Sequence, residues 1–137
     1  MTSKPTTLEL AQRWLDEDKD PQTRAQIEAL VAGRDEQALE ELLRNPVEFG
    51  TAGLRARMEA GYSRLNQLTV ISASQGLAAF VELQIPSAPE RGVVIGHDHR
   101  HNSAVFALLT ARAFVDRGFR VHFFPEPGFT PQVPFAV

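Results

Sequence analysis

Two short segments of this 137-residue sequence carry side chains whose types and spacing could do chemistry. In the first, residues 48–55 (EFGTAGLR), two glycines flank Thr51 and Arg55 follows closely. Glycines let the backbone approach a ligand, exposed amides and the Thr51 hydroxyl can donate to phosphate oxygens, and Arg55 can make a bidentate charge-assisted contact. Because the same pattern is typical of a turn or a bulge, the residues alone leave both interpretations open.

The second segment, residues 96–101 (GHDHRH), has alternating histidines. If a strand continued through it, His97, His99 and His101 would project from one face and could bind a divalent metal, with Asp98 on the other face. That arrangement would favour metal-assisted hydrolysis. The alternative is a polar loop in which Asp98 accepts hydrogen bonds from the backbone or from an arginine.

Composition excludes several other classes of function. There are no cysteines, so disulfides and thiolate chemistry are absent, and 17 acidic and 14 basic residues are mixed along the chain. Without a basic arm or stripe, nucleic acid is not an expected partner. Apolar runs do not approach the ~20 residues that a membrane span needs, and no secretory signal or P-loop is visible. We expect a cytoplasmic protein without a membrane segment.

The elements that must position these segments begin with a helical extension. Three helices are predicted between residues 6 and 45, each with a polar N-cap followed by apolar residues at helical spacing. The expected caps are Thr6, Asp20 and Asp35. Pro46 disfavours a helical residue before it and should end the third helix. We therefore expect residues 1–46 to form a separate helical extension.

From residue 47 onward, short apolar segments separated by glycine indicate an α/β domain over residues 47–137. Residues 92–97 and 119–124 are predicted strands, and residues 103–117 are the helix between them. A unit of this kind pairs its strands in parallel with a right-handed crossover. Residues 96–102 would then lie at the carboxyl edge of the sheet, where α/β proteins bind ligands.

Further segments complete the expected domain. Residues 47–57 are predicted to be extended, residues 69–83 to form a helix packed on a sheet, and residues 86–89 to form a loop. Thr130 followed by Pro131 fits the N-cap and first turn of another helix.

Several ordered motifs together resemble the α-D-phosphohexomutase superfamily. Residues 48–55 are similar to its opening signature. Residues 63–69 (SRLNQLT) with residues 75–76 (QG) resemble the branch that contains phosphopentomutase, related phosphoglucomutases and glucose-1,6-bisphosphate synthase. Residues 94–100 (VIGHDHR) are similar to a strand ending in an Asp-x-Arg step, and residues 129–137 resemble the run before the family's catalytic loop.

The resemblance implies a fold and a reaction. The fold is a three-layer αβα sandwich with a mixed, largely parallel sheet, the first domain of a four-domain enzyme. In that family a phosphoserine donates its phosphoryl group to a sugar phosphate, a bisphosphate intermediate reorients, and the serine is rephosphorylated. The reaction interconverts glucose 1-phosphate and glucose 6-phosphate, ribose 1-phosphate and ribose 5-phosphate, or both. Mg²⁺ and glucose 1,6-bisphosphate serve as cofactors of the full-length enzymes.

The resemblance also implies roles for individual residues. Thr51 and Arg55 match positions that contact the substrate phosphate, whereas Asp98 and Arg100 match a step that supports the active-site loop. The phosphoserine loop, the magnesium loop and the other domains are expected beyond Val137. No catalytic or metal-binding residue is therefore assigned here, and residues 47–137 are expected to be a domain incomplete at its C-terminal end.

On this interpretation the fragment alone is expected to be inactive and to bind no cofactor. Its expected partners are sugar phosphates and the C-terminal domains of the parent enzyme. Two alternatives stay open from the sequence: a metal-dependent hydrolase that uses His97, His99 and His101, and a non-catalytic binding module.

Overall fold

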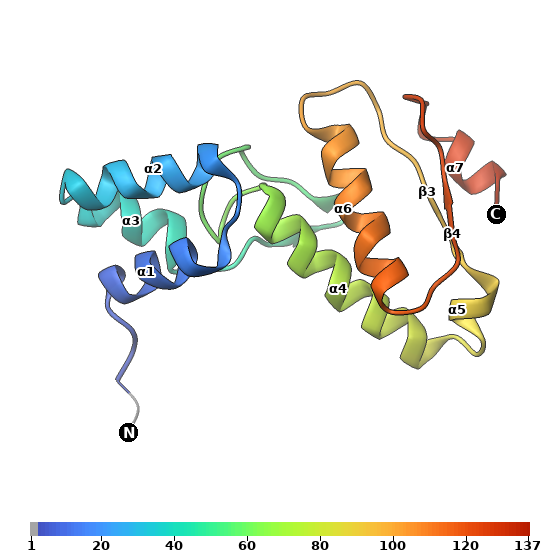
Figure 1. Cartoon of the computed structure of the whole chain (residues 1–137), viewed down its shortest axis with the longest axis horizontal. Helices are drawn as coiled ribbons and strands as arrows, with labels where there is room; N and C mark the ends of the chain where they lie inside the picture. Colours follow the sequence, from blue (N-terminus) through green and yellow to red (C-terminus); the bar gives the residue numbers. More distant parts are fainter. Residues whose placement is uncertain (1–2) are drawn as a thin grey trace. The chain divides into compact units, whose positions relative to one another are not determined.

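A computed structural model describes residues 3–137 and divides the chain into two compact units, one ending at Thr69 and the other covering Val70–Val137. Unit 1 begins with the three helices α1 (Thr7–Glu17), α2 (Pro21–Ala32) and α3 (Glu36–Leu43) (Figure 1). Thr6, Asp20 and Asp35 each accept a hydrogen bond from a backbone amide in the first turn of the helix that follows. The three predicted N-caps are confirmed.

The core of unit 1 joins the helices to the segment that follows them. Trp14, Ile27 and Leu39 are 0% exposed, one from each helix. Ala60 is buried in the same cluster, and Tyr62 packs its ring edge against Trp14 with centroids 5.0 Å apart. Residues 47–69 thus share a core with the helices, and the domain boundary expected after residue 46 stays a prediction.

A short hairpin carries the first candidate segment. Strands β1 (Phe49–Gly50) and β2 (Gly53–Leu54) pair antiparallel, so Thr51 and Ala52 form a two-residue turn. Gly53 has a φ of +103°, a conformation that favours glycine. The extended structure expected over residues 47–57 is therefore confirmed in part, because each strand has only two residues.

Unit 2 contains the predicted strand–helix–strand motif. Its elements are α4 (Gln67–Gln84), which begins in unit 1, α5 (Ala88–Arg91), β3 (Val93–Ile95), α6 (Ser103–Asp116), β4 (Val121–Phe123) and α7 (Gln132–Phe135). Strands β3 and β4 pair in parallel, as predicted, although each is three residues long; Val93 lies opposite Val121. The prediction of a loop over residues 86–89 is wrong for residues 88 and 89, because helix α5 starts at Ala88. Ser87, just before it, has a left-handed backbone conformation.

The core of unit 2 lies where helix α6 meets the sheet. Phe114 and Phe119 are buried in a T-shaped pair with centroids 5.1 Å apart, alongside Ala78 of α4. The described residues form two sheets of two strands each. The α/β class is confirmed, but the large mixed sheet of a three-layer sandwich is not formed by residues 3–137. None of the described helices is long and apolar enough to span a membrane.

Candidate functional site

The first candidate segment opens onto a hollow of about 520 Å³ in unit 1. Its charged lining consists of Glu41, Glu48, Arg55, Arg57 and Arg64. Arg55 directly follows β2 and is exposed. In the described part of the chain, Arg55 has no ion pair or side-chain hydrogen bond. Thr51 is also exposed but lies in the hairpin turn, outside the lining of the hollow.

The neighbouring arginines of this hollow are already engaged. Arg64, with a side chain only 16% exposed, donates from Nε to Glu59 at 2.7 Å and from Nη2 to Glu41 at 2.6 Å. The hydrogen bond to Glu59 is the main cause that raises the pKa of Arg64. Arg57 lies 3.7 Å from the same Glu59 oxygen. Among the described residues, Arg55 is therefore the arginine of this hollow that has no carboxylate partner, and it is open to an anionic ligand.

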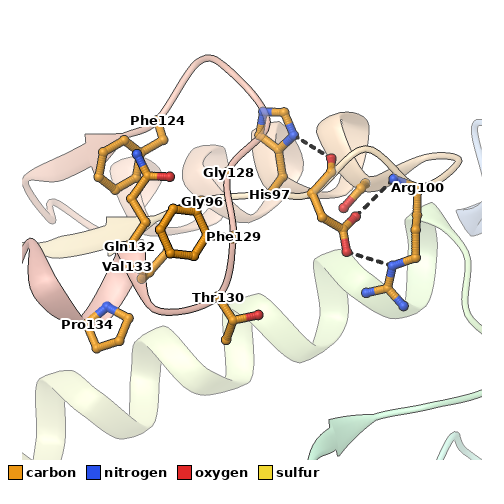
Figure 2. Close-up of a pocket in the computed structure, with 12 residues that line it drawn as sticks. Gly96, His97, Arg100, Phe124, Gly128, Phe129, Thr130, Gln132, Val133 and Pro134 are labelled. Atoms are coloured by element: carbon orange, nitrogen blue, oxygen red, sulfur yellow. Dashed lines mark hydrogen bonds and ion pairs between the residues drawn. The ribbon is translucent and has the colours of Figure 1, made fainter.

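A second hollow, of about 380 Å³, lies in unit 2 where β3 and β4 end (Figure 2). Figure 2 shows the rings of Phe124 and Phe129 on one side and Arg100 on the other. A Cβ on Gly96 would lie 2.7 Å from the Val133 side chain, so a larger residue at position 96 would require Val133 of α7 to shift.

The structure brings Asp98 and Arg100 together beside this second hollow. Asp98 accepts from the Arg100 amide at 3.0 Å and from Arg100 Nε at 2.6 Å. Hydrogen bonds from the Ser103 hydroxyl, the Arg100 amide and the Arg100 side chain lower the pKa of the Asp98 carboxyl to about 2. The hydrogen bond from Ser103 joins Asp98 to the first residue of α6, and the Asp98–Arg100 pair lies within the loop after β3.

The histidines of this loop do not form the metal site that an extended strand would have made. Residues 96–102 are irregular, and strand β3 ends at Ile95. Both ring nitrogens of His97 face backbone carbonyl oxygens, that of Asp98 at 3.0 Å and that of Pro125 at 3.2 Å. Across residues 3–137, no group of three His, Asp or Glu side chains is placed to hold a metal ion.

Thr51 and Arg55 belong to unit 1, whereas Asp98 and Arg100 belong to unit 2. Sequence reasoning noticed Arg64 only as part of a motif, and it missed the roles of Glu41 and Glu59. These carboxylates are 23 and 5 residues from Arg64 in the chain, spacings for which local sequence patterns give no signal. Gln132 and Phe129 also line the second hollow, and their place in the motif of residues 129–137 was the available signal.

Comparison with known proteins identifies the class to which this fold and these segments belong. Residues 46–137, more than half of the chain, match the family model described as phosphoglucomutase/phosphomannomutase, alpha/beta/alpha domain I. The chain therefore belongs to the phosphoglucomutase/phosphomannomutase family, and the resemblance inferred from its motifs is confirmed. No solved structure gives a significant match.

Similar proteins carry the names of phosphosugar enzymes. The chain is 47% identical over 133 residues to a probable phosphoribomutase of Schizosaccharomyces pombe, covering 97% of this chain and 23% of that protein. It is 42% identical to a phosphopentomutase and 37% identical to a glucose 1,6-bisphosphate synthase, both of Mus musculus, covering 91% of this chain and 21% of each protein. The chain thus spans about a fifth of the length of these relatives. Neither the hydrolase nor the binding-module alternative is favoured.

Proposed function

We propose that this chain is the N-terminal part of a phosphosugar mutase, an isomerase of carbohydrate metabolism that moves a phosphoryl group within a sugar phosphate. Its substrates would be ribose 1-phosphate and ribose 5-phosphate, glucose 1-phosphate and glucose 6-phosphate, or both. The family match and the names of the relatives support this class of reaction. We propose the cytoplasm as its location, following the expectation from the sequence.

In this proposal, Arg55 binds the phosphate of the substrate, and Thr51 donates to it from the hairpin turn. The observation that carries the proposal is the exposed Arg55 guanidinium, which faces a hollow where the arginines beside it are paired with glutamates. Arginine suits this role because its planar fork matches two phosphate oxygens at once. Asp98 and Arg100 would support the active-site loop through their mutual hydrogen bonds.

The other groups that the reaction needs would be supplied by further polypeptide, which corresponds to the part of the relatives that this chain does not span. Across residues 3–137, no group of three His, Asp or Glu side chains is placed to hold a metal ion, and we propose that Mg²⁺ binds to the complete enzyme. Glucose 1,6-bisphosphate would act in the complete enzyme. Such polypeptide would also extend the β3–β4 sheet into the mixed sheet of an αβα sandwich.

Exposed apolar side chains on α4 and α6, here called the outer face of unit 2, support the presence of this additional polypeptide. Leu77, Phe80 and Leu83 of α4 are 53%, 60% and 81% exposed, and Leu108 of α6 is 59% exposed. A helix that is apolar on all sides is normally buried on more than one of them. We therefore propose that the C-terminal part of the mutase covers this face.

A chimera tests the proposal. This chain would replace the matched N-terminal segment of the S. pombe relative, and interconversion of ribose 1-phosphate and ribose 5-phosphate would be measured with Mg²⁺ and glucose 1,6-bisphosphate. We expect turnover comparable to that of the unmodified relative. A folded chimera without turnover, beside an active unmodified relative, would contradict the proposal.

Substitution of Arg55 in that chimera tests the assigned contact. Arg55→Lys keeps the charge but loses the fork, so losing a charge-assisted hydrogen bond worth about 1.5–3 kcal/mol should slow kcat/KM by roughly 10- to 100-fold. Arg55→Ala should be slower still. Arg13→Ala, on the exposed side of α1, is the control and should leave kcat/KM unchanged. If both Arg55 variants lower only thermal stability, the assignment is wrong.

A further inference from the structure

The hairpin that carries Arg55 cannot fix its own position. Each of its strands has two residues, and residues 49–52 are exposed. An isolated hairpin of two strands is at best marginally stable in water. The placement of Arg55 must therefore come from contacts on either side of the hairpin.

Both ends of the hairpin are tied to one segment, residues 61–65. Before the hairpin, the Val47 amide donates to the Tyr62 carbonyl oxygen at 2.7 Å. After the hairpin, the Leu65 amide donates to the Arg57 carbonyl oxygen at 2.9 Å. The segment of residues 61–65 is thus the common anchor of the chain entering and leaving the hairpin.

This anchor is in turn attached to helix α3. The Ser63 amide donates to the Leu42 carbonyl oxygen at 3.1 Å, and the Ser63 hydroxyl donates to the Glu41 carbonyl oxygen at 3.0 Å. Gly61 packs so closely on α3 that a Cβ would lie 2.5 Å from the Leu42 oxygen. Helix α3 therefore sets the position of the anchor.

Arg64 connects all the parts of this arrangement. Its Nη2 donates to Glu41 of α3 at 2.6 Å, its Nη1 to the Ser63 hydroxyl at 2.9 Å, and its Nε to Glu59 at 2.7 Å. Glu59 lies on the chain leaving the hairpin, two residues after Arg57. These bonds use every nitrogen of the guanidinium, which therefore acts as a clamp.

We propose that Arg64 is a positioning residue, which holds the hairpin against α3 so that Arg55 meets the phosphate. This inference rests on the proposed function, because it takes Arg55 as the phosphate contact. Loss of the clamp would also leave the Glu41 and Glu59 carboxylates without this counter-ion, and Glu41 lines the hollow beside Arg55. An unpaired carboxylate there would repel a phosphate.

The test uses the ¹⁵N-labelled chain of 137 residues, with ribose 5-phosphate as the probe. Arg64→Lys keeps a positive charge but cannot reach two carboxylates and a hydroxyl at once. We expect it to speed hydrogen exchange at the Val47 and Leu65 amides, and to weaken ribose 5-phosphate binding, each by on the order of 10-fold. Exchange at the Gly33 amide, which closes α2, should not change.

Arg44→Lys is the matched control. Arg44, the C-cap of α3, is likewise an arginine that donates to a glutamate, Glu40, and to a further oxygen, the Pro5 carbonyl, but it does not line the hollow. It should lower thermal stability while leaving exchange at Val47 and Leu65 and the affinity for ribose 5-phosphate unchanged.

Two results separate failure of this inference from failure of the proposed function. If Arg64→Lys and Arg44→Lys speed exchange across unit 1 to the same extent, Arg64 is a general stabiliser and the inference is overturned. If the wild-type chain and Arg55→Ala have the same affinity for ribose 5-phosphate, the proposed phosphate contact fails. The exchange rates at Val47 and Leu65 then decide alone whether Arg64 positions the hairpin.

Discussion

The two units of this chain bury their apolar side chains to different extents. In unit 1, Trp14, Ile27 and Leu39 are 0% exposed and meet in one core. In unit 2, Ala78, Phe114 and Phe119 are 0%, 3% and 4% exposed, whereas Phe80 and Leu83 of α4 are 60% and 81% exposed. Both units expose some large apolar side chains, but three of those in unit 2, Leu77, Phe80 and Leu83, come from the single helix α4.

This difference follows from the helix sequences. In α1, apolar residues are confined to one side of the helix, because the exposed Glu9, Gln12 and Asp16 occupy the side opposite Trp14. Helix α4 has apolar residues on every side and no charged residue from Gln67 to Val81. A helix of the first kind needs one partner surface, and a helix of the second kind needs at least two. The polar network of Arg64 adds to the contrast, because it fixes a loop of unit 1 through ion pairs.

The largest effect is expected from a cavity in the core of unit 1. Leu39→Ala removes a side chain that is 0% exposed and should lower the free energy of unfolding by about 2–5 kcal/mol. The single tryptophan, Trp14, lies in the same core, so its fluorescence during urea unfolding reports on unit 1 directly. Leu8→Ala, at a position 56% exposed, should change the free energy by less than about 0.5 kcal/mol. Equal effects of the two substitutions would refute the enclosed core.

The next effect concerns the close contact of Gly61 with α3. Gly61 has a φ of +120°, and a Cβ would lie 2.5 Å from the Leu42 oxygen. Gly61→Ala should therefore destabilise unit 1 by about 2–4 kcal/mol, from backbone strain and overpacking together. Gly53→Ala is the matched control, because its φ is +103° but nothing lies within 4 Å. It should cost about 1–2 kcal/mol from strain alone. The same Trp14 fluorescence assay would show whether the two variants differ by less than this in their free energies of unfolding.

Much of this fold could be predicted because its signals are local. The caps at Thr6, Asp20 and Asp35 lie within three residues of the amides that they accept from, and the parallel pairing of β3 with β4 follows from the helix between them. Strand lengths were overestimated, because the predicted strands covered residues 92–97 and 119–124 whereas the pairing covers only Val93–Ile95 and Val121–Phe123.

The candidate site was predictable only where a motif carried it. Arg55 and the pair Asp98–Arg100 stand in contiguous motifs, and the pair does interact. The pairing of Arg64 with Glu41 depends on tertiary packing across 23 residues, and no periodicity in the sequence encodes it. The alternating histidines left a strand and a polar loop as alternatives, and β3 ends at Ile95, before the histidines could share a face.

A pH titration tests the hydrogen bonds to Asp98 in the loop after β3 of unit 2. The hydrogen bonds from Ser103 and Arg100 lower the pKa of Asp98 in the folded chain to about 2, from an ordinary value of 3.8. Because the pKa is lowered, the ionised Asp98 stabilises the fold at pH values above its ordinary pKa of 3.8. This contribution is lost as the pH falls toward 2. NMR of the Asp98 carboxyl carbon should show a midpoint near 2, and Ser103→Ala should raise it. A midpoint near 3.8 in the wild-type chain would show that these hydrogen bonds do not form.

The smallest effect in this chain is expected at Leu83, and it gives the sharpest test of the contrast between the units. Leu83→Lys changes a side chain that is 81% exposed, so the free energy of unfolding of the 137-residue chain should move by no more than about 0.5 kcal/mol. In the chimera with the S. pombe relative, the same lysine would be buried against the proposed C-terminal part. Burying an unpaired charge is costly, so thermal stability should fall there by several degrees. Gln84→Lys, next along α4 and also exposed, should be neutral in both proteins. If Leu83→Lys is neutral in both proteins too, the outer face of α4 is exposed to solvent in the mutase as well, and its apolar side chains do not mark an interface.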